Sequence, residues 1–362
     1  MTREEFIERQ VVFQLGLCSA EPGLDLVEFA RDLRNSSFFF LHNPADGSFV
    51  PEAHAIGLWR SADGTWSYGA PGKNPRGRLN ATFLNDVYQH GLRSPMLSDM
   101  ANAIARNDPQ FPVFQYNRQR DTNAILWPLG RIHDLSVDSF CTPPVAAEIG
   151  LREKTPTVFW RGTLVGMSRY RGRIYNIQNV IRAFVQGEIA KDVLLEHLGT
   201  IARYNFVSRY HGAEGFDVGF IDAHRLAFYN AVPEIARYMK AGVSPEEQVR
   251  HRYLPCLRGN DVGSSFRWQV AAKSVILKES YPWEVFFDCH FRPGEHFVPI
   301  AEDFSDVQEK IAWCEKNLDE CEAMNRRRAE IVPLLRDAEI RREALTQVLS
   351  RYADLYDRWL GR

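Results

Sequence analysis

Short apolar runs that end in polar turns recur through the second half of the chain. Residues 157–160 (TVFW) lead into a turn that begins at Arg161, and residues 253–257 (YLPCL) lead into a glycine-rich segment at 258–267. Runs of this length, bounded by turn residues, are typical of buried strands. Further strands are predicted at 275–278 and 296–300, and helices at 175–201 and 223–240. This alternation of strands and helices predicts an α/β fold.

The first half is predicted to mix helices with shorter strands. Its helical patterns cover residues 2–34 and 80–107, and its strand-like runs cover 38–41, 112–116 and 124–127. Residues 59–78 are dense in Gly, Pro, Arg and aromatic residues, which predicts an irregular loop or a hairpin. The aromatic rings there either pin the loop or form a platform on which a sugar stacks, and the first interpretation is favoured.

The length of 362 residues predicts two lobes, because a single hydrophobic core stops growing at a smaller size. A hinge is predicted at residues 142–145 (TPPV), which separates a lobe at 1–145 from a lobe at 146–317. A helical tail follows at 318–362. Its apolar positions at helical spacing favour packing across both lobes. A dimerising coiled coil is the alternative, although Pro333 interrupts the pattern.

The composition describes an ordinary folded enzyme and excludes several partner classes. Lys and Arg number 44 against 46 Asp and Glu, so a nucleic-acid-binding protein is not indicated. The six cysteines are scattered without a C-x-x-C pair, which favours a reducing compartment. No apolar stretch is long enough for export or membrane spanning. A cytoplasmic location is therefore expected, with peripheral association with the inner membrane left open.

Two segments that follow predicted strands carry residues suited to binding a diphosphate. Small residues let backbone amides approach an anion, and arginine guanidinium groups donate charge-assisted pairs of hydrogen bonds to it. The carboxyl ends of parallel strands meet at one edge of a sheet, so both segments can converge on one ligand there. The alternative is a pair of surface turns. The candidate residues are Arg161, Gly162, Thr163, Arg169, Arg258, Gly259, Ser264, Ser265, Phe266 and Arg267.

The sequence YLPCLRGNDVGSSFRWQVAAKSVIL, followed by PWEVFF and HFVPI, resembles the donor-binding half of glycosyltransferase family 90. The same order of motifs is kept upstream, where PVFQYNRQRD, AILWP and VFWRGT occur in turn. The resemblance extends from Pro112 to Asn317. Trp160 and Thr163 stand where other members more often have Phe and Ser, and the stretch between Arg173 and Tyr253 is longer than expected.

The resemblance implies a GT-B-like pair of Rossmann-type lobes with a cleft between them. It further implies that the carboxyl-terminal lobe holds a UDP-sugar and that the sugar is transferred with inversion to an acceptor hydroxyl. Thr163 and Arg169 match the hydroxyl and the arginine of the family's first turn. Arg258 and Gly259 match its RG turn, and Arg267 matches the arginine of its SFR element.

Inverting transfer needs a base that takes the proton of the acceptor hydroxyl. The family supplies an Asp within an Arg-Asp-Tyr-Pro-like element upstream of the PVF-like strand, and this sequence lacks that element. The family spacing leads back from Pro112 to Asp99, which is the candidate base, with Asp108 and Asp121 as reserves. A helix-capping or surface role for Asp99 is the alternative.

No metal is predicted, because the chain has no Asp-x-Asp motif of the kind that holds a divalent cation on a sugar-nucleotide diphosphate. Arginines would replace the cation, and no cofactor is expected besides the donor. Asp288, His290, Glu295 and His296 cluster in sequence, but no second motif completes a metal site with them.

The sequence therefore predicts a metal-independent glycosyltransferase that uses a UDP-sugar of the glucose, xylose or galactose type. The expected acceptor is a glycan or a lipid-linked glycan, such as a precursor of bacterial lipopolysaccharide. The alternative is a non-catalytic sugar-nucleotide-binding protein of the same fold. A kinase or nucleotide hydrolase is disfavoured, since no P-loop or kinase motif is present. The sugar, the acceptor and the oligomeric state stay open.

Overall fold

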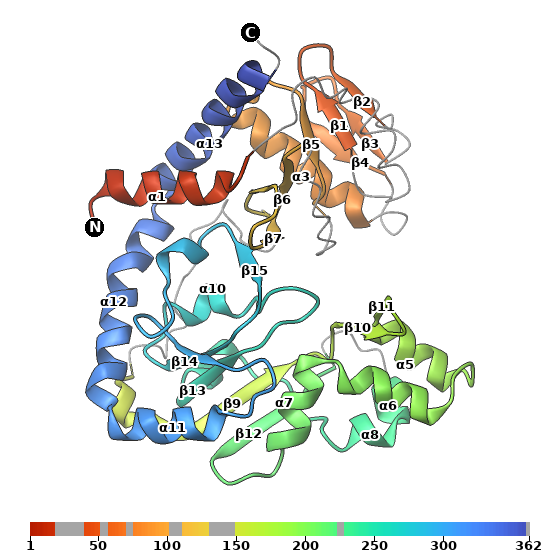
Figure 1. The fold of residues 1–362 in the computed structure, drawn as a ribbon, viewed down its shortest axis with the longest axis vertical. Coiled ribbons are helices and arrows are strands. Elements are labelled where there is room, and N and C mark those ends of the chain that lie inside the picture. The colour runs from red at the N-terminus through yellow and green to blue at the C-terminus, as the bar shows by residue number, and fades with distance from the viewer. Residues whose placement is uncertain are drawn as a thin grey trace. The chain divides into compact units, whose positions relative to one another are not determined.

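The computed structural model describes residues 1–18, 40–50, 57–69, 75–100, 111–129, 149–222 and 228–359. Two compact units, each built from separated stretches of chain, are present. The first comprises Met1–Phe140, Pro282–His290 and Pro333–Arg362, and the second comprises Cys141–Tyr281 and Phe291–Val332. Both contain sheets and helices, which confirms the α/β class (Figure 1). The predicted lobes at 1–145 and 146–317 and the predicted tail at 318–362 stay predictions. Packing assigns Pro282–His290 and the end of the tail to the first unit.

The first unit contains a five-stranded mixed sheet in the order β2-β1-β5-β6-β8. β5, β6 and β8 run parallel, and β1 is antiparallel to β2 and β5. The strands are β1 (Phe40–Asn43), β2 (Ser48–Val50), β5 (Met96–Ser98), β6 (Val113–Gln115) and β8 (Ala124–Leu126). The predicted strands at 112–116 and 124–127 are confirmed, as is the part of 38–41 that is described.

The single helix predicted at 80–107 is wrong at residues 96–98, which form β5, and residues 101–107 lie outside the described part of the chain. Helix α3 (Pro75–Gln89) ends before Gly91, whose φ of +83° lies in the left-handed region that ends helices. Met96, Leu97 and Ser98 then form β5, and all three are buried between β1 and β6. The apolar spacing of this segment suits a helix, but a central place in the sheet overrides it.

The segment predicted as a loop or hairpin at 59–78 contains an antiparallel pair, β3 (Leu58–Arg60) and β4 (Trp66–Tyr68). Trp66 is buried in a small core with Phe40, Phe49 and Leu58. The ring of Trp66 therefore pins the hairpin, as the favoured interpretation held.

Arg118 joins the amino-terminal helix of the first unit to its strands. This side chain is 5% exposed and donates hydrogen bonds to the carbonyl oxygens of Phe13 (2.6 Å) and Gln14 (3.2 Å), near the end of α1 (Arg3–Leu15). It also forms an ion pair with Glu284 at 3.2 Å. The pair spans β7 (Asn117–Gln119) and β15 (Trp283–Val285), which run antiparallel. This pairing explains why residues 282–290 pack with the first half of the chain.

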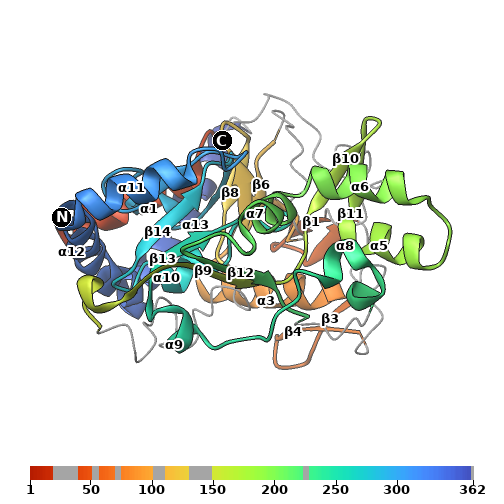
Figure 2. The ribbon, with the colours of Figure 1, turned by 90° about the horizontal axis from the view of Figure 1, so that it is seen from below.

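The second unit is built on a five-stranded sheet in the order β12-β9-β13-β14-β16. All four neighbouring pairs are parallel, so the five carboxyl ends lie along one edge. Figure 2 shows β12, β9, β13 and β14 side by side. The strands are β9 (Thr155–Gly162), β12 (Phe216–Phe220), β13 (His251–Cys256), β14 (Val275–Glu279) and β16 (Val298–Ile300).

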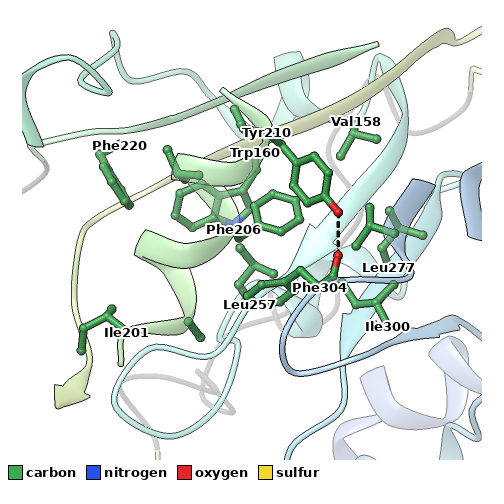
Figure 3. Packing of buried hydrophobic residues seen from close by; sticks show 14 of the residues in the cluster. Val158, Trp160, Ile201, Phe206, Tyr210, Phe220, Leu257, Leu277, Ile300 and Phe304 are labelled. Carbon is green, nitrogen blue, oxygen red and sulfur yellow. Dashed lines mark hydrogen bonds between the residues drawn. The ribbon is translucent and has the colours of Figure 1, made fainter. Parts of the chain in front are cut away.

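A continuous apolar core covers one face of this parallel sheet. Val158 and Trp160, two positions apart on β9, both enter it, as do Leu277 of β14 and Ile300 of β16 (Figure 3). Tyr210 closes the core by donating a hydrogen bond from its hydroxyl to the carbonyl oxygen of Phe304, at 2.6 Å. This core supports the sheet whose carboxyl edge carries the loops that follow β9 and β13.

Helices and a second hairpin complete the chain. The hairpin consists of β10 (Met167–Tyr170) and β11 (Arg173–Asn176) and, like β12, falls outside the predicted strands. The remaining α-helices are α5 (Ile177–Val185), α6 (Lys191–Gly199), α7 (Ala202–Tyr210), α8 (Pro233–Ala236), α9 (Pro245–Gln248), α10 (Phe266–Gln269), α11 (Val307–Lys316), α12 (Leu318–Arg336) and α13 (Ala338–Trp359). Short 3-10 helices lie at Leu151–Glu153, Phe228–Ala231 and Asp288–His290.

The tail is helical as predicted, but its break lies after Pro333. Helix α12 continues through Pro333 to Arg336, and the carboxylate of Asp337 then accepts hydrogen bonds from the amides of Glu339 (2.8 Å) and Ile340 (3.0 Å). These bonds satisfy the free amides at the start of α13. The predicted hinge at 142–145 lies outside the described residues. No helix in the described parts of the chain has the length and apolar character needed to cross a bilayer.

Candidate functional site

The two segments predicted to bind a diphosphate leave neighbouring strands at the carboxyl edge of the second unit's sheet. β9 ends at Gly162 and is followed by Thr163, whereas β13 ends at Cys256 and is followed by the loop that contains Arg258 and Gly259. β9 and β13 are adjacent and parallel. The structure therefore brings the two Arg-Gly segments to one place, as the sequence predicts.

Arg203 of α7 fastens the two loops to each other. Its guanidinium donates hydrogen bonds to the carbonyl oxygen of Thr163 at 2.8 Å and to that of Arg258 at 3.0 Å. Gly259 approaches this guanidinium so closely that a Cβ atom there would lie 3.2 Å from one of its terminal nitrogens. The Arg203 side chain thus positions the main chain of both loops.

The glycine-rich loop is also held at both ends by residues that follow β14 or end it. Glu279 accepts a hydrogen bond from the backbone amide of Arg258 at 2.8 Å, and the Tyr281 hydroxyl accepts one from the amide of Gly263 at 3.0 Å. A Cβ atom at Gly263 would lie 2.5 Å from the sulfur of buried Cys256. Only glycine fits there, so the loop has one tightly defined path.

Arg258 and Glu279 form the main ion pair of the site. The Nε atom of Arg258 lies 3.0 Å from one carboxylate oxygen of Glu279, which is 2% exposed, and its guanidinium also contacts exposed Glu302 at 3.2 Å. Burial raises the pKa of Glu279 from 4.5 to about 7, although Arg258 opposes the shift. Glu302 raises this pKa further, and Arg203 lowers it.

Glu279→Gln is expected to alter how stability depends on pH. A carboxyl group whose pKa is raised by folding stabilises the protein at low pH, and this contribution is lost as the pH rises from 4.5 through about 7. The unfolding free energy of the wild type, relative to the variant, should fall by roughly 2 to 3 kcal/mol between about pH 5 and pH 8. Thermal or urea unfolding across this pH range measures the difference.

Glu302→Gln is the matched control, because Glu302 contacts the same guanidinium from an exposed position. It should leave the pH profile of the wild type nearly unchanged. Identical profiles for the wild type and Glu279→Gln would show that Glu279 does not titrate in this range.

The remaining loop residues differ in solvent exposure. Ser264 is exposed, and Ser265 and Arg267 are half-buried at the start of α10. Phe266 is 3% exposed and packs its ring against Phe291 and Phe297, so its side chain anchors the loop from the inside. In the same loop, the amide oxygen of Asn260 is buried without a hydrogen-bond partner among the described residues, and a ligand donor could satisfy it.

Arg161 and Arg169 lie on elements other than the two loops. The Arg161 guanidinium faces β12, where it donates to both carboxylate oxygens of Asp217 at 2.8 Å. Arg169 is an exposed residue of β10, opposite Ile174. Gly162 lies at the strand end as predicted, and a Cβ atom there would lie 2.4 Å from the Trp160 ring. The structure thus pairs Arg161 with a residue of the neighbouring strand and places Arg169 on the β10–β11 hairpin. The donor contacts of both residues stay predictions.

The candidate base, Asp99, belongs to the first unit. It directly follows β5, at the carboxyl end of a strand that runs parallel to β6, and its amide donates to the Phe114 carbonyl oxygen at 2.9 Å. The side chain is 1% exposed. Of the two reserves, Asp121 is an exposed turn residue with a φ of +61°, and Asp108 lies outside the described residues. The position of Asp99 at a strand end suits a catalytic residue of an α/β sheet.

Arg203 and Glu279 were missed by reasoning from motifs, although each leaves a signal in the sequence. Arg203 lies three, four and seven positions before the buried residues Phe206, Val207 and Tyr210, and therefore shares their helix face. Glu279 is a carboxylate at the end of a strand that begins with three apolar residues. A charged group on an apolar helix face or at the end of a buried strand requires partners, so both residues were identifiable as members of a polar network.

Within the part of the chain that the structure describes, no group of three or more His, Cys, Asp or Glu side chains is arranged to hold a metal ion. Independence from metals stays a prediction for the reaction.

Comparison with known proteins defines the class. The family model of glycosyl transferase family 90 matches residues 94–357, nearly three quarters of the chain, and the protein belongs to this family. The matched region contains Asp99 and all of the candidate loop residues.

Individual relatives are similar over shorter stretches. O-glucosyltransferase LpsA of Dichelobacter nodosus is 28% identical over 123 residues, which cover 34% of this chain and 36% of that protein. Protein O-glucosyltransferase 3 of Rattus norvegicus is 28% identical over 71 residues, or 20% of this chain and 14% of its own length. Uncharacterized protein 179R of Invertebrate iridescent virus 6 is 32% identical over 92 residues, or 23% and 8%. The aligned parts thus span little more than a third of each relative at most.

Proposed function

We propose that the protein transfers a sugar, with inversion, from a UDP-sugar to the hydroxyl of a glycan or lipid-linked glycan. The observation that carries the proposal is the paired loop structure at the carboxyl edge of the second unit's sheet. Arg203 and Glu279 hold its main chain, and the loop presents glycines, serines and arginines where α/β folds bind phosphates. Membership of glycosyltransferase family 90 supports a sugar nucleotide as the ligand.

The donor diphosphate is assigned to the exposed and half-buried residues of these loops. Arg258 and Arg267 would offset its negative charge, while Thr163, Ser264 and Ser265 supply hydroxyl donors. No divalent cation is required in this scheme, because arginines stabilise the departing UDP. Asp99 would take the proton of the acceptor hydroxyl. Residues 146–317 then serve as the donor lobe of a GT-B-like enzyme, and residues 1–145 serve the acceptor.

Glucose is the first choice of transferred sugar, because the relatives that carry functional names are O-glucosyltransferases. Xylose and galactose are the alternatives. A surface glycan such as lipopolysaccharide, assembled on the cytoplasmic side of a membrane, is the proposed acceptor class. A non-catalytic sugar-nucleotide-binding protein is the second candidate, and it is favoured if none of Asp99, Asp108 and Asp121 serves as the base.

A donor panel tests the proposal. UDP-glucose, UDP-xylose, UDP-galactose and GDP-glucose are each incubated with the protein in EDTA, and release of the free nucleotide is measured. Hydrolysis or transfer with UDP-glucose, and little with GDP-glucose, is expected. Binding of UDP without turnover of any donor would favour the non-catalytic alternative.

A further inference from the structure

A stretch without acidic residues surrounds the β10–β11 hairpin. Residues 154–187 contain six Lys and Arg and no Asp or Glu, in a chain that has 46 acidic residues. Two of the six cations are used internally, since Lys154 donates to the Ser274 hydroxyl at 2.9 Å and Arg161 pairs with Asp217. The cations of the hairpin itself, Arg169, Arg171 and Arg173, are exposed. None of these three has an ion-pair partner among the described residues.

One face of the hairpin is anchored to the protein. Ser168 is fully buried, and its hydroxyl lies 2.6 Å from the Nδ1 atom of His197 on α6. The rings of Tyr170 and Tyr175 lie 4.7 and 5.1 Å from the His197 ring, between centroids. Side chains alternate along a strand, so the residues between these positions point the other way.

The outer face of the hairpin combines a cation with apolar side chains. Arg169 is directly opposite Ile174 in the antiparallel register, and Met167 is two positions from Arg169 on the same strand. Cross-strand partners share a face of the pair. Ile174 is 57% exposed and Met167 is 37% exposed. Arg171 and Arg173 flank Gly172 at the turn, where Arg173 is opposite Tyr170 and therefore belongs to the other face. Both side chains are exposed, so the turn next to the outer face carries positive charge.

This pairing of properties restricts the partner. Arginine guanidinium groups bind phosphate oxygens. The transfer of exposed isoleucine and methionine side chains from water is favourable only into an apolar environment. A nucleic acid or a phosphorylated glycan supplies phosphate without hydrocarbon. The interface of a bilayer that contains anionic lipids supplies both.

We propose that the β10–β11 hairpin docks on an anionic phospholipid surface through Met167 and Ile174 of its outer face and through Arg171 and Arg173 at its turn. The base of the hairpin lies beside the donor loops, because a Cβ atom at Gly166 would be 3.6 Å from the carbonyl oxygen of Gly259. If the proposed function holds, docking brings the donor site to acceptors that are carried by the membrane. The docking itself does not depend on that function.

Cosedimentation with vesicles tests the proposal. The full-length protein should bind vesicles of phosphatidylcholine with about one third phosphatidylglycerol, and bind pure phosphatidylcholine vesicles weakly. Binding should decline at high salt, since screening shortens the reach of charge interactions. Replacing Arg171 and Arg173 together by Gln should weaken binding roughly thirtyfold, because each basic residue near an anionic surface contributes about 1 kcal/mol. Met167→Ser combined with Ile174→Ser should also weaken it, by about tenfold or more.

The matched control is Arg237→Gln combined with Arg326→Gln, which removes the same charge at two exposed positions elsewhere. It should bind anionic vesicles like the wild type. Arg169 is left unchanged in all variants because of its predicted donor contact, and thermal unfolding midpoints verify that each variant is folded. Three results would each overturn the proposal. The control variant could weaken binding as much as the replacement of Arg171 and Arg173 does, the wild type could bind neutral vesicles as well as anionic ones, or inorganic phosphate at constant ionic strength could displace the protein from the vesicles.

Discussion

Replacing Asp99 by Asn is expected to lower sugar transfer by about two to four orders of magnitude, the usual contribution of a general base. UDP affinity should be nearly unchanged, because the donor loops belong to the other unit. Asn has almost the same shape as Asp, which matters at a position that is 1% exposed. Steady-state transfer rates and calorimetric UDP titration measure the two effects separately.

Asp121→Asn is the control for this experiment. Asp121 is an exposed acidic residue of the same unit, and Asn tolerates its positive φ. Transfer by this variant should match that of the wild type. If Asp99→Asn is as active as the wild type while Asp121→Asn is inactive, the base is Asp121 and the spacing argument from Pro112 fails.

Replacing Arg267 by Ala is expected to weaken UDP binding roughly ten- to hundredfold. A charge-assisted hydrogen bond to the diphosphate contributes about 1.5 to 3 kcal/mol, and alanine removes it. Arg267→Lys should recover only part of the affinity, because an ammonium group cannot form the bidentate contact of a guanidinium. Calorimetric titration with UDP gives the affinities, and thermal unfolding reports on folding.

Arg237→Ala is the comparison variant, since Arg237 is an exposed arginine of the same unit whose guanidinium lies 5.5 Å from the Tyr238 ring centre. Its UDP affinity should equal that of the wild type. An unchanged affinity in Arg267→Ala would exclude this side chain from the donor pocket.

The strands that support the donor loops could be predicted because they are buried on both sides. Residues 157–160, 253–257 and 275–278 are short apolar runs, and they become β9, β13 and β14. The convergence of their loops follows from parallel strand order alone. The family resemblance added the order of motifs, and the family match covers residues 94–357.

Other elements depend on tertiary contacts that no local pattern reports. β5 replaces part of a predicted helix because Met96, Leu97 and Ser98 complete the centre of a sheet. β7 and β15 pair across a long stretch of sequence, which local periodicity cannot show. The β10–β11 hairpin lacks an apolar run, since half of its side chains face solvent. For the same reason, the ion pair of Arg161 with Asp217 of β12 could not be predicted from motifs, and a donor contact of Arg161 stays a prediction.

The central claim is that the loops after β9 and β13 bind the UDP part of a sugar donor without a metal. Calorimetric titration of the purified protein with UDP, GDP and CMP in the presence of EDTA tests it most directly. The account predicts binding that is selective for UDP and is not strengthened by added Mg²⁺ or Mn²⁺. Absence of binding by all three nucleotides, or binding of UDP only when a divalent cation is added, would contradict it.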